Sequence, residues 1–112
     1  MELRLRKIND ISVIELNGFL TMNLGEYNIK KTITDLLNNG DKKILFKLDN
    51  VEFINSAGIG ELVGAYISVT NRGGMIKLCG IPEKVNKMLR VTKVISIFNT
   101  YKTEEEAISS FG

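Results

Sequence analysis

The sequence contains no histidine and no tryptophan, and it has one cysteine, Cys79, and one proline, Pro82. Without histidine the chain lacks the commonest general base and metal ligand, which excludes most hydrolase triads and zinc sites. A single cysteine permits no internal disulfide, and this favours a reducing, cytoplasmic setting. We therefore predict a protein that is not an enzyme, with no catalytic residue, no metal site and no cofactor.

Long hydrophobic runs and a strong charge of one sign are absent as well. The first ten residues, MELRLRKIND, lack the apolar run and cleavage site of a signal peptide, and no segment is apolar enough to cross a membrane. The formal net charge is +2, and Lys and Arg are interspersed with acidic residues. A nucleic-acid partner would require a basic stripe, so we expect neither nucleic-acid binding nor membrane insertion.

The pattern along the chain predicts strands that alternate with helices. A length of 112 residues corresponds to one domain, spanning 1–112. Strands are predicted from alternating or short apolar runs at 3–8, 11–16, 42–50 and 75–81. Gly18 is predicted to end the second strand. Helices are predicted at 24–38, at 56–71, after Pro82 and after Thr103. This order indicates an α/β fold with crossover connections.

The segment FINSAGIGELVGAY, residues 53–66, joins a strand to a helix and has two unexpected glycines. A glycine inside a helix costs about 1 kcal/mol relative to alanine. Gly58 and Gly60 therefore indicate that the backbone lies close to another group there, or that the site must stay open. Ser56 is predicted to be the N-cap, a role that stabilises a helix by about 1 kcal/mol. A phosphate on Ser56 would also be tolerated at a helix start.

The two faces of the predicted helix differ in composition. One face is an apolar stripe expected to contact the core, formed by Ile59, Leu62, Val63, Tyr66, Ile67 and Thr70. The other face carries Ala57, Glu61, Gly64, Ala65 and Ser68, almost without the long charged residues that usually cover an exposed helix. This face is either a docking surface or a surface that packs under the tail or a neighbouring helix.

Nucleotide-binding motifs are incomplete. The pattern Gly58-x-Gly60-x-x-Val63 lacks the third glycine of a dinucleotide fingerprint, and the chain has no P-loop. A nucleotide-binding or catalytic domain is therefore disfavoured.

The segment KKILFKLDNVEFINSAGIGELVGAY resembles the signature of the STAS domain family, the bacterial anti-sigma factor antagonists and their relatives. The specific part is Asp-Ser-x-Gly-hydrophobic-Gly, which here begins at Asn55 and ends at Gly60. The resemblance covers essentially the whole chain. It implies a single STAS-like domain, with a mixed sheet of about four to five strands and about four helices packed against it.

The resemblance also implies a regulatory cycle. Ser56 would be phosphorylated by an anti-sigma factor with serine kinase activity and restored by a metal-dependent serine phosphatase. The unphosphorylated protein would bind the anti-sigma factor and release a sigma factor. The alternative is a non-switching STAS module of a transporter or larger signalling assembly, in which Ser56 only caps the helix.

Two positions depart from the family pattern. Asn55 stands where the family usually has aspartate, and Thr21 stands where it often has an acid. Both make the surroundings of Ser56 less acidic. The predicted partner-binding residues are Thr21, Asn55, Ser56, Ala57, Gly58, Gly60, Glu61, Gly64, Ala65 and Ser68.

Overall fold

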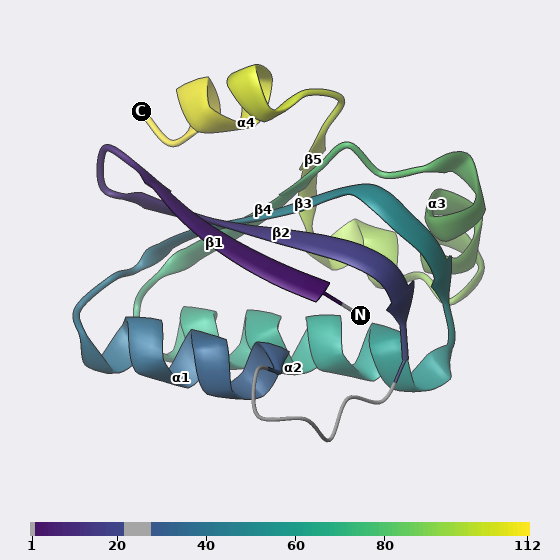
Figure 1. Cartoon of the computed structure of the whole chain (residues 1–112), viewed down its shortest axis with the longest axis horizontal. Helices are drawn as coiled ribbons and strands as arrows, with labels where there is room; N and C mark the ends of the chain where they lie inside the picture. Colours follow the sequence, from purple (N-terminus) through teal and green to yellow (C-terminus); the bar gives the residue numbers. More distant parts are fainter. Residues whose placement is uncertain (1, 22–27) are drawn as a thin grey trace.

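The computed structural model describes residues 2–21 and 28–112 (Figure 1). Within these residues the chain forms five strands, four α-helices and one short 3-10 helix. Their bounds are β1 (Glu2–Ile8), β2 (Ile11–Leu20), α1 (Ile29–Asn38), β3 (Lys43–Ile54), α2 (Ser56–Asn71), β4 (Met75–Cys79), α3 (Glu83–Val91), η1 (Val94–Ile97), β5 (Asn99–Tyr101) and α4 (Glu104–Ser110).

The strands form one mixed sheet in which spatial order follows chain order, β1-β2-β3-β4-β5. A tight hairpin pairs β1 antiparallel with β2, and each later strand pairs parallel with the one before it. Because successive crossovers run the same way across the sheet, α1, α2 and α3 cover one face, and α4 covers the other (Figure 1). The predicted α/β fold with a mixed sheet is confirmed.

Several predicted boundaries were wrong. Gly18 does not end β2, because it adopts a φ of +90° beside a register shift, and pairing with β3 continues to Leu20. A bulge of this kind favours glycine, and the strand resumes after it. The strand predicted at 42–50 runs on to Ile54. The helix predicted at 24–38 is seen from Ile29, and positions 24–27 lie outside the described residues.

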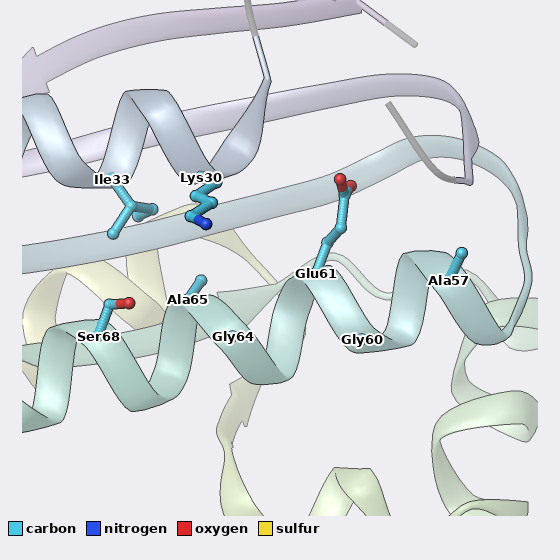
Figure 2. A pocket seen from close by; sticks show the side chains of 8 residues that line it. All are labelled: Lys30, Ile33, Ala57, Gly60, Glu61, Gly64, Ala65 and Ser68. Atoms are coloured by element: carbon cyan, nitrogen blue, oxygen red, sulfur yellow. The ribbon is translucent and has the colours of Figure 1, made fainter. Parts of the chain in front are cut away.

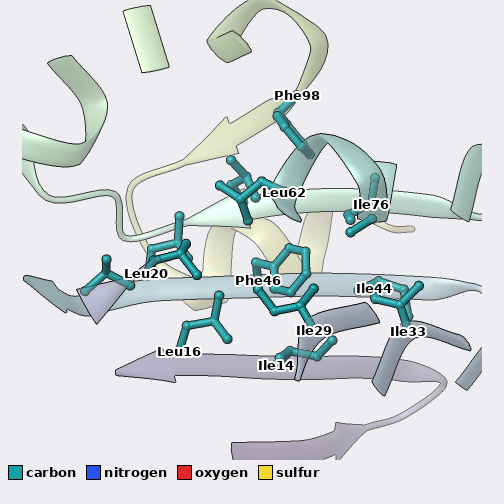
Figure 3. Close-up of a cluster of buried hydrophobic side chains, with 14 of the residues drawn as sticks. Ile14, Leu16, Leu20, Ile29, Ile33, Ile44, Phe46, Leu62, Ile76 and Phe98 are labelled. Carbon is teal, nitrogen blue, oxygen red and sulfur yellow. The ribbon is translucent and has the colours of Figure 1, made fainter. Parts of the chain in front are cut away.

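The larger core lies between the sheet and α1, α2 and α3 (Figure 3). Phe46 of β3 is fully buried at its centre, and the neighbouring strands add Ile14 and Leu78 from the same face. Alternate residues along each strand point to the same side of the sheet. Every second residue of β2, β3 and β4 therefore contributes to this core. From the helices, Leu62 and Leu89 are both fully buried.

The second core is smaller and lies under α4. Cys79 is fully buried there, and its burial raises the pKa of the thiol to about 12. Lys77 is also buried, and its Nζ donates to the Ser110 carbonyl at 3.0 Å and to the Ser110 hydroxyl at 2.8 Å. The same ammonium lies 4.6 Å from the centre of the Phe111 ring. These contacts fix α4 on the sheet.

An ion-pair network at the start of α4 makes the stability of the fold depend on pH. The hydrogen bond from Arg6 holds the pKa of Glu104 below its usual value, and Lys47 lies 3.6 Å from the same carboxylate. A carboxylate whose pKa is lower in the folded than in the unfolded state stabilises the fold at a pH above the unfolded pKa, which is about 4.3 for glutamate. This contribution is lost as the pH falls through the lowered pKa.

We therefore expect Glu104→Gln to reduce the free energy of unfolding by about 0.5 to 1 kcal/mol at pH 7. The difference from wild type should shrink as the pH falls from about 4.3, the unfolded value, through the lowered pKa of Glu104, because the carboxylate becomes protonated over this range. Urea unfolding at a series of pH values measures both effects. Glu105→Gln, on the exposed side of the same turn, is the control and should change stability little. A loss that is equal at pH 7 and at low pH would contradict the ion-pair explanation.

Candidate functional site

Asn55, and not Ser56, caps helix α2. The backbone of Asn55 is extended, and its side-chain oxygen accepts a hydrogen bond of 3.0 Å from the Gly58 N–H. The prediction that Ser56 is the N-cap was wrong. Serine and asparagine both suit an N-cap, and Asn55 is the last residue with an extended backbone before the helix. Ser56 is instead the first residue of the helix and is exposed. Its hydroxyl is therefore not needed to cap the helix.

Gly58 lies where the start of α2 meets the end of β2. A Cβ atom at this position would lie 2.0 Å from the Leu20 carbonyl oxygen and 3.0 Å from Cγ1 of Ile54. The same carbonyl accepts a hydrogen bond of 3.4 Å from the Asn55 N–H, which holds the two segments together. Gly58 is thus required by close backbone approach. A Cβ at Gly60, by contrast, would meet nothing within 4 Å.

The predicted core stripe of α2 is partly wrong. Ile59 and Leu62 are buried as expected, whereas Ile67 is 51% exposed and Thr70 is exposed. Val69 is fully buried in their place. The helix is therefore rotated relative to the predicted stripe, because it packs against both the sheet and α1.

The face of small residues borders a groove between α1 and α2, which we call the α1–α2 groove (Figure 2). Its volume is about 400 Å³, and it is lined by Lys30, Ile33, Ala57, Gly60, Glu61, Gly64, Ala65 and Ser68. Ala65 is buried, while Gly60, Gly64 and Ser68 are exposed. The predicted packing against a neighbouring helix is therefore seen at Ala65, and the rest of the face is an open surface.

A second hollow lies on the other side of the helix start, and we call it the Ser56 pocket. Its volume is about 370 Å³, and it is lined by Glu52, Phe53, Ile54, Asn55, Ser56, Lys84 and Met88. Phe53 is 50% exposed and Phe19 is 59% exposed, and their two rings meet edge to face with centroids 6.0 Å apart. Ser56 therefore stands beside an exposed pair of aromatic rings.

The structure brings most of the predicted partner-binding residues to one end of the sheet. Thr21 follows Leu20 at the end of β2, next to the β3–α2 junction that holds Asn55 and Ser56. The remaining residues continue along α2 into the α1–α2 groove, as far as Ser68. Gly58 differs from them because it is buried and supports the site instead of facing solvent.

Sequence reasoning missed the residues that α1, α3 and β2 add to this surface. Lys30 and Ile33 line the α1–α2 groove, and Lys84 and Met88 line the Ser56 pocket. Phe19 was also missed. It comes directly after Gly18, and a prediction that β2 continues past this glycine would have included it in the strand. The others depend on how helices far apart in the sequence pack together.

Residues 2–21 and 28–112 lack two further kinds of feature. In residues 2–21 and 28–112, no group of three or more Cys, Asp and Glu side chains is arranged to hold a metal ion. Over the same residues, no helix is long and apolar enough to cross a membrane.

A model of the STAS domain matches residues 2–107. The chain belongs to the STAS domain family. A candidate anti-sigma factor antagonist of Thermotoga neapolitana is 31% identical to this STAS protein over 101 residues, which cover 90% of this chain and 89% of the relative. The names of such relatives describe regulatory proteins and not enzymes.

Two solved structures show how closely the STAS fold is shared. A candidate anti-sigma factor antagonist from Thermotoga maritima matches with a TM-score of 0.83 at 27% identity, covering 96% of this chain and 92% of that one. The phosphorylated form of the Bacillus cell fate determinant SpoIIAA matches with a TM-score of 0.73 at 20% identity, covering 99% and 100%. The second likeness shows the fold alone.

Proposed function

We propose that this STAS protein is an anti-sigma factor antagonist controlled by phosphorylation of Ser56. The observation that carries the proposal is the position of this serine. Ser56 is exposed at the first position of α2, Asn55 has taken the capping role, and the α1–α2 groove begins one residue later at Ala57. A hydroxyl that is exposed and dispensable for the helix can be modified without unfolding the domain.

In this proposal the unphosphorylated protein binds an anti-sigma factor with serine kinase activity and so releases a sigma factor. The kinase transfers the γ-phosphoryl group of ATP to Ser56 Oγ, which loses its proton, and ADP leaves. The phosphate adds nearly two negative charges at the edge of the α1–α2 groove, and the partner dissociates. A metal-dependent serine phosphatase hydrolyses the phosphoserine and restores the hydroxyl.

A second candidate function is a constitutive interaction module of a transporter or a larger signalling assembly. Asn55 and Thr21 favour it, since Asn55 replaces the aspartate that the family pattern usually has before the serine, and Thr21 stands where the loop after the second strand often has an acid. In this case the α1–α2 groove is a permanent interface. The protein would then carry no phosphate on Ser56 in its native cells.

Ser56→Asp is expected to weaken binding of the anti-sigma factor on the order of 10- to 100-fold, which corresponds to about 1.4 to 2.7 kcal/mol for a charge placed at the edge of an interface. Thermal stability should stay nearly unchanged, because an acid at the first turn of a helix is tolerated. Titration calorimetry with each purified kinase-type anti-sigma factor of the source organism measures the affinity. Intact-mass spectrometry after incubation with ATP measures phosphoryl transfer.

Two variants serve as controls for this experiment. Ser56→Ala should bind as wild type does and accept no phosphate. Ser109→Asp adds the same charge at an exposed position on α4, on the opposite face of the sheet, and should leave binding unchanged. The constitutive module would be favoured by two results together. Ser56→Asp would bind the anti-sigma factor as wild type does, and Ser56 would be unmodified in protein from native cells.

A further inference from the structure

We infer that Lys84 forms an ion pair with the phosphate on Ser56, so that the domain itself holds the modified side chain. This inference rests on the proposed function, because it concerns the phosphorylated state of the same serine. It adds a phosphate-binding residue on α3, a helix that is separated from Ser56 by the whole of α2 and β4.

The fold places the two side chains at one hollow. Ser56 begins α2, Lys84 lies in the first turn of α3, and both line the Ser56 pocket of about 370 Å³. Buried neighbours fix the position of α3 on the sheet, because Val85 is 1% exposed and Leu89 is fully buried in the core that contains Phe46. Lys84 itself is exposed, on the side of α3 that borders the pocket.

Lys84 forms no ion pair with any residue in the described part of the chain. Its neighbour Glu83 is engaged elsewhere, with Oε1 lying 3.4 Å from the Arg90 guanidinium. Glu52 of β3 faces the same pocket, and Asp49 lies in an adjoining hollow that Lys84 also borders. From α2, the first charged residue is Glu61, which lines the α1–α2 groove instead. Lys84 is thus the cation placed to meet a phosphate on Ser56.

The chemistry of the two groups matches. A phosphoserine carries a charge of about −1.5 to −2 at pH 7, with a second pKa near 6, and an ammonium group offers three donors. A nearby cation favours the dianion and lowers this second pKa, whereas a nearby carboxylate raises it. Lys84 and Glu52 therefore act in opposite directions on the same phosphate, which makes the pair of residues a direct test.

The experiment uses the full chain with phosphoserine inserted at position 56 during translation, so no kinase is needed. The second pKa of the phosphoserine is measured by ³¹P NMR titration. Lys84→Gln should raise it by about 0.3 to 0.7 pH units relative to wild type, the range expected for an exposed ion pair. Glu52→Gln should lower it. Added salt should shrink the effect of Lys84→Gln, since exposed charges are screened.

The matched control is Lys87→Gln, which removes an exposed lysine from the same helix that does not line the Ser56 pocket. It should leave the phosphoserine pKa within about 0.1 unit of wild type, and circular dichroism should show that every variant is folded. An unchanged pKa in Lys84→Gln, or an equal rise in Lys87→Gln, would overturn the inference. Either result leaves the proposed function standing, whereas an unphosphorylated Ser56 in native cells would count against that function and not against this titration.

Discussion

Gly58→Ala is expected to reduce the free energy of unfolding by about 2 to 3 kcal/mol, the upper part of the range for overpacking a filled site. The added Cβ would lie 2.0 Å from the oxygen and 2.8 Å from the carbon of the Leu20 carbonyl. Both atoms belong to the backbone, so no side chain can rotate to make room. The start of α2 must move away from β2, and the 3.4 Å hydrogen bond from Asn55 to Leu20 is weakened. Urea unfolding measures the loss.

The same substitution two residues later provides the control. A Cβ at Gly60 meets nothing within 4 Å, and the same is true of Gly64. Alanine is the better helix former, so Gly60→Ala should raise the free energy of unfolding by up to about 1 kcal/mol. The two changes are chemically identical and differ only in what surrounds them. Equal effects at Gly58 and Gly60 would mean that the contact between α2 and β2 gives way easily.

The second large effect is expected from Phe46→Ala, which should reduce the free energy of unfolding by about 3 to 5 kcal/mol. Phe46 is fully buried at the centre of the core between the sheet and the helices (Figure 3). Its removal loses buried apolar area and leaves a cavity that well-packed neighbours fill only in part. Because small domains are stable by only about 5 to 15 kcal/mol, the variant should be marginally folded.

Phe53→Ala tests whether burial causes this loss. Phe53 lies on the same strand as Phe46 but is 50% exposed and contacts the ring of Phe19. Its replacement should cost less than about 1 kcal/mol, the range for an exposed aromatic contact. Thermal and urea unfolding of both variants provide the comparison. Similar losses in the two variants would mean that Phe53 is packed much more tightly than its exposure indicates.

The elements with a clear apolar period could be predicted from the sequence, and their ends could not. Strands β1 to β4 and the four helices follow from alternating or helical patterns that are local in the chain. The end of β2 depends on a bulge at Gly18. Only the pairing with β3 shows that the strand continues beyond this bulge to Leu20. Strand β5 was missed because its three residues, Asn99–Tyr101, are too few to show a period.

The candidate site was predictable in part, for a similar reason. The sequence indicated Ser56 and the small residues of α2, but of two adjacent cap-forming residues we predicted the wrong one, because Asn55 and not Ser56 caps the helix. The two glycines looked alike in the sequence, although Gly58 is needed for close packing and Gly60 is open. What distinguishes them is the Leu20 carbonyl, more than thirty positions away in the chain. Lys84 comes from another helix and could not have been placed by local pattern at all.

The order of the strands has a consequence for how the protein is made. Since spatial order in the sheet follows chain order, each new strand leaving the ribosome finds the edge of its partner already formed. The β1–β2 hairpin can form first, and β3, β4 and β5 then add one after another, each across a connection that contains a helix. Helix α4 is synthesised last among the described elements. Until it arrives, Ile11, Val13 and Leu45 lack the helix that covers them in the folded domain, and apolar surface exposed in this way favours aggregation of a nascent chain.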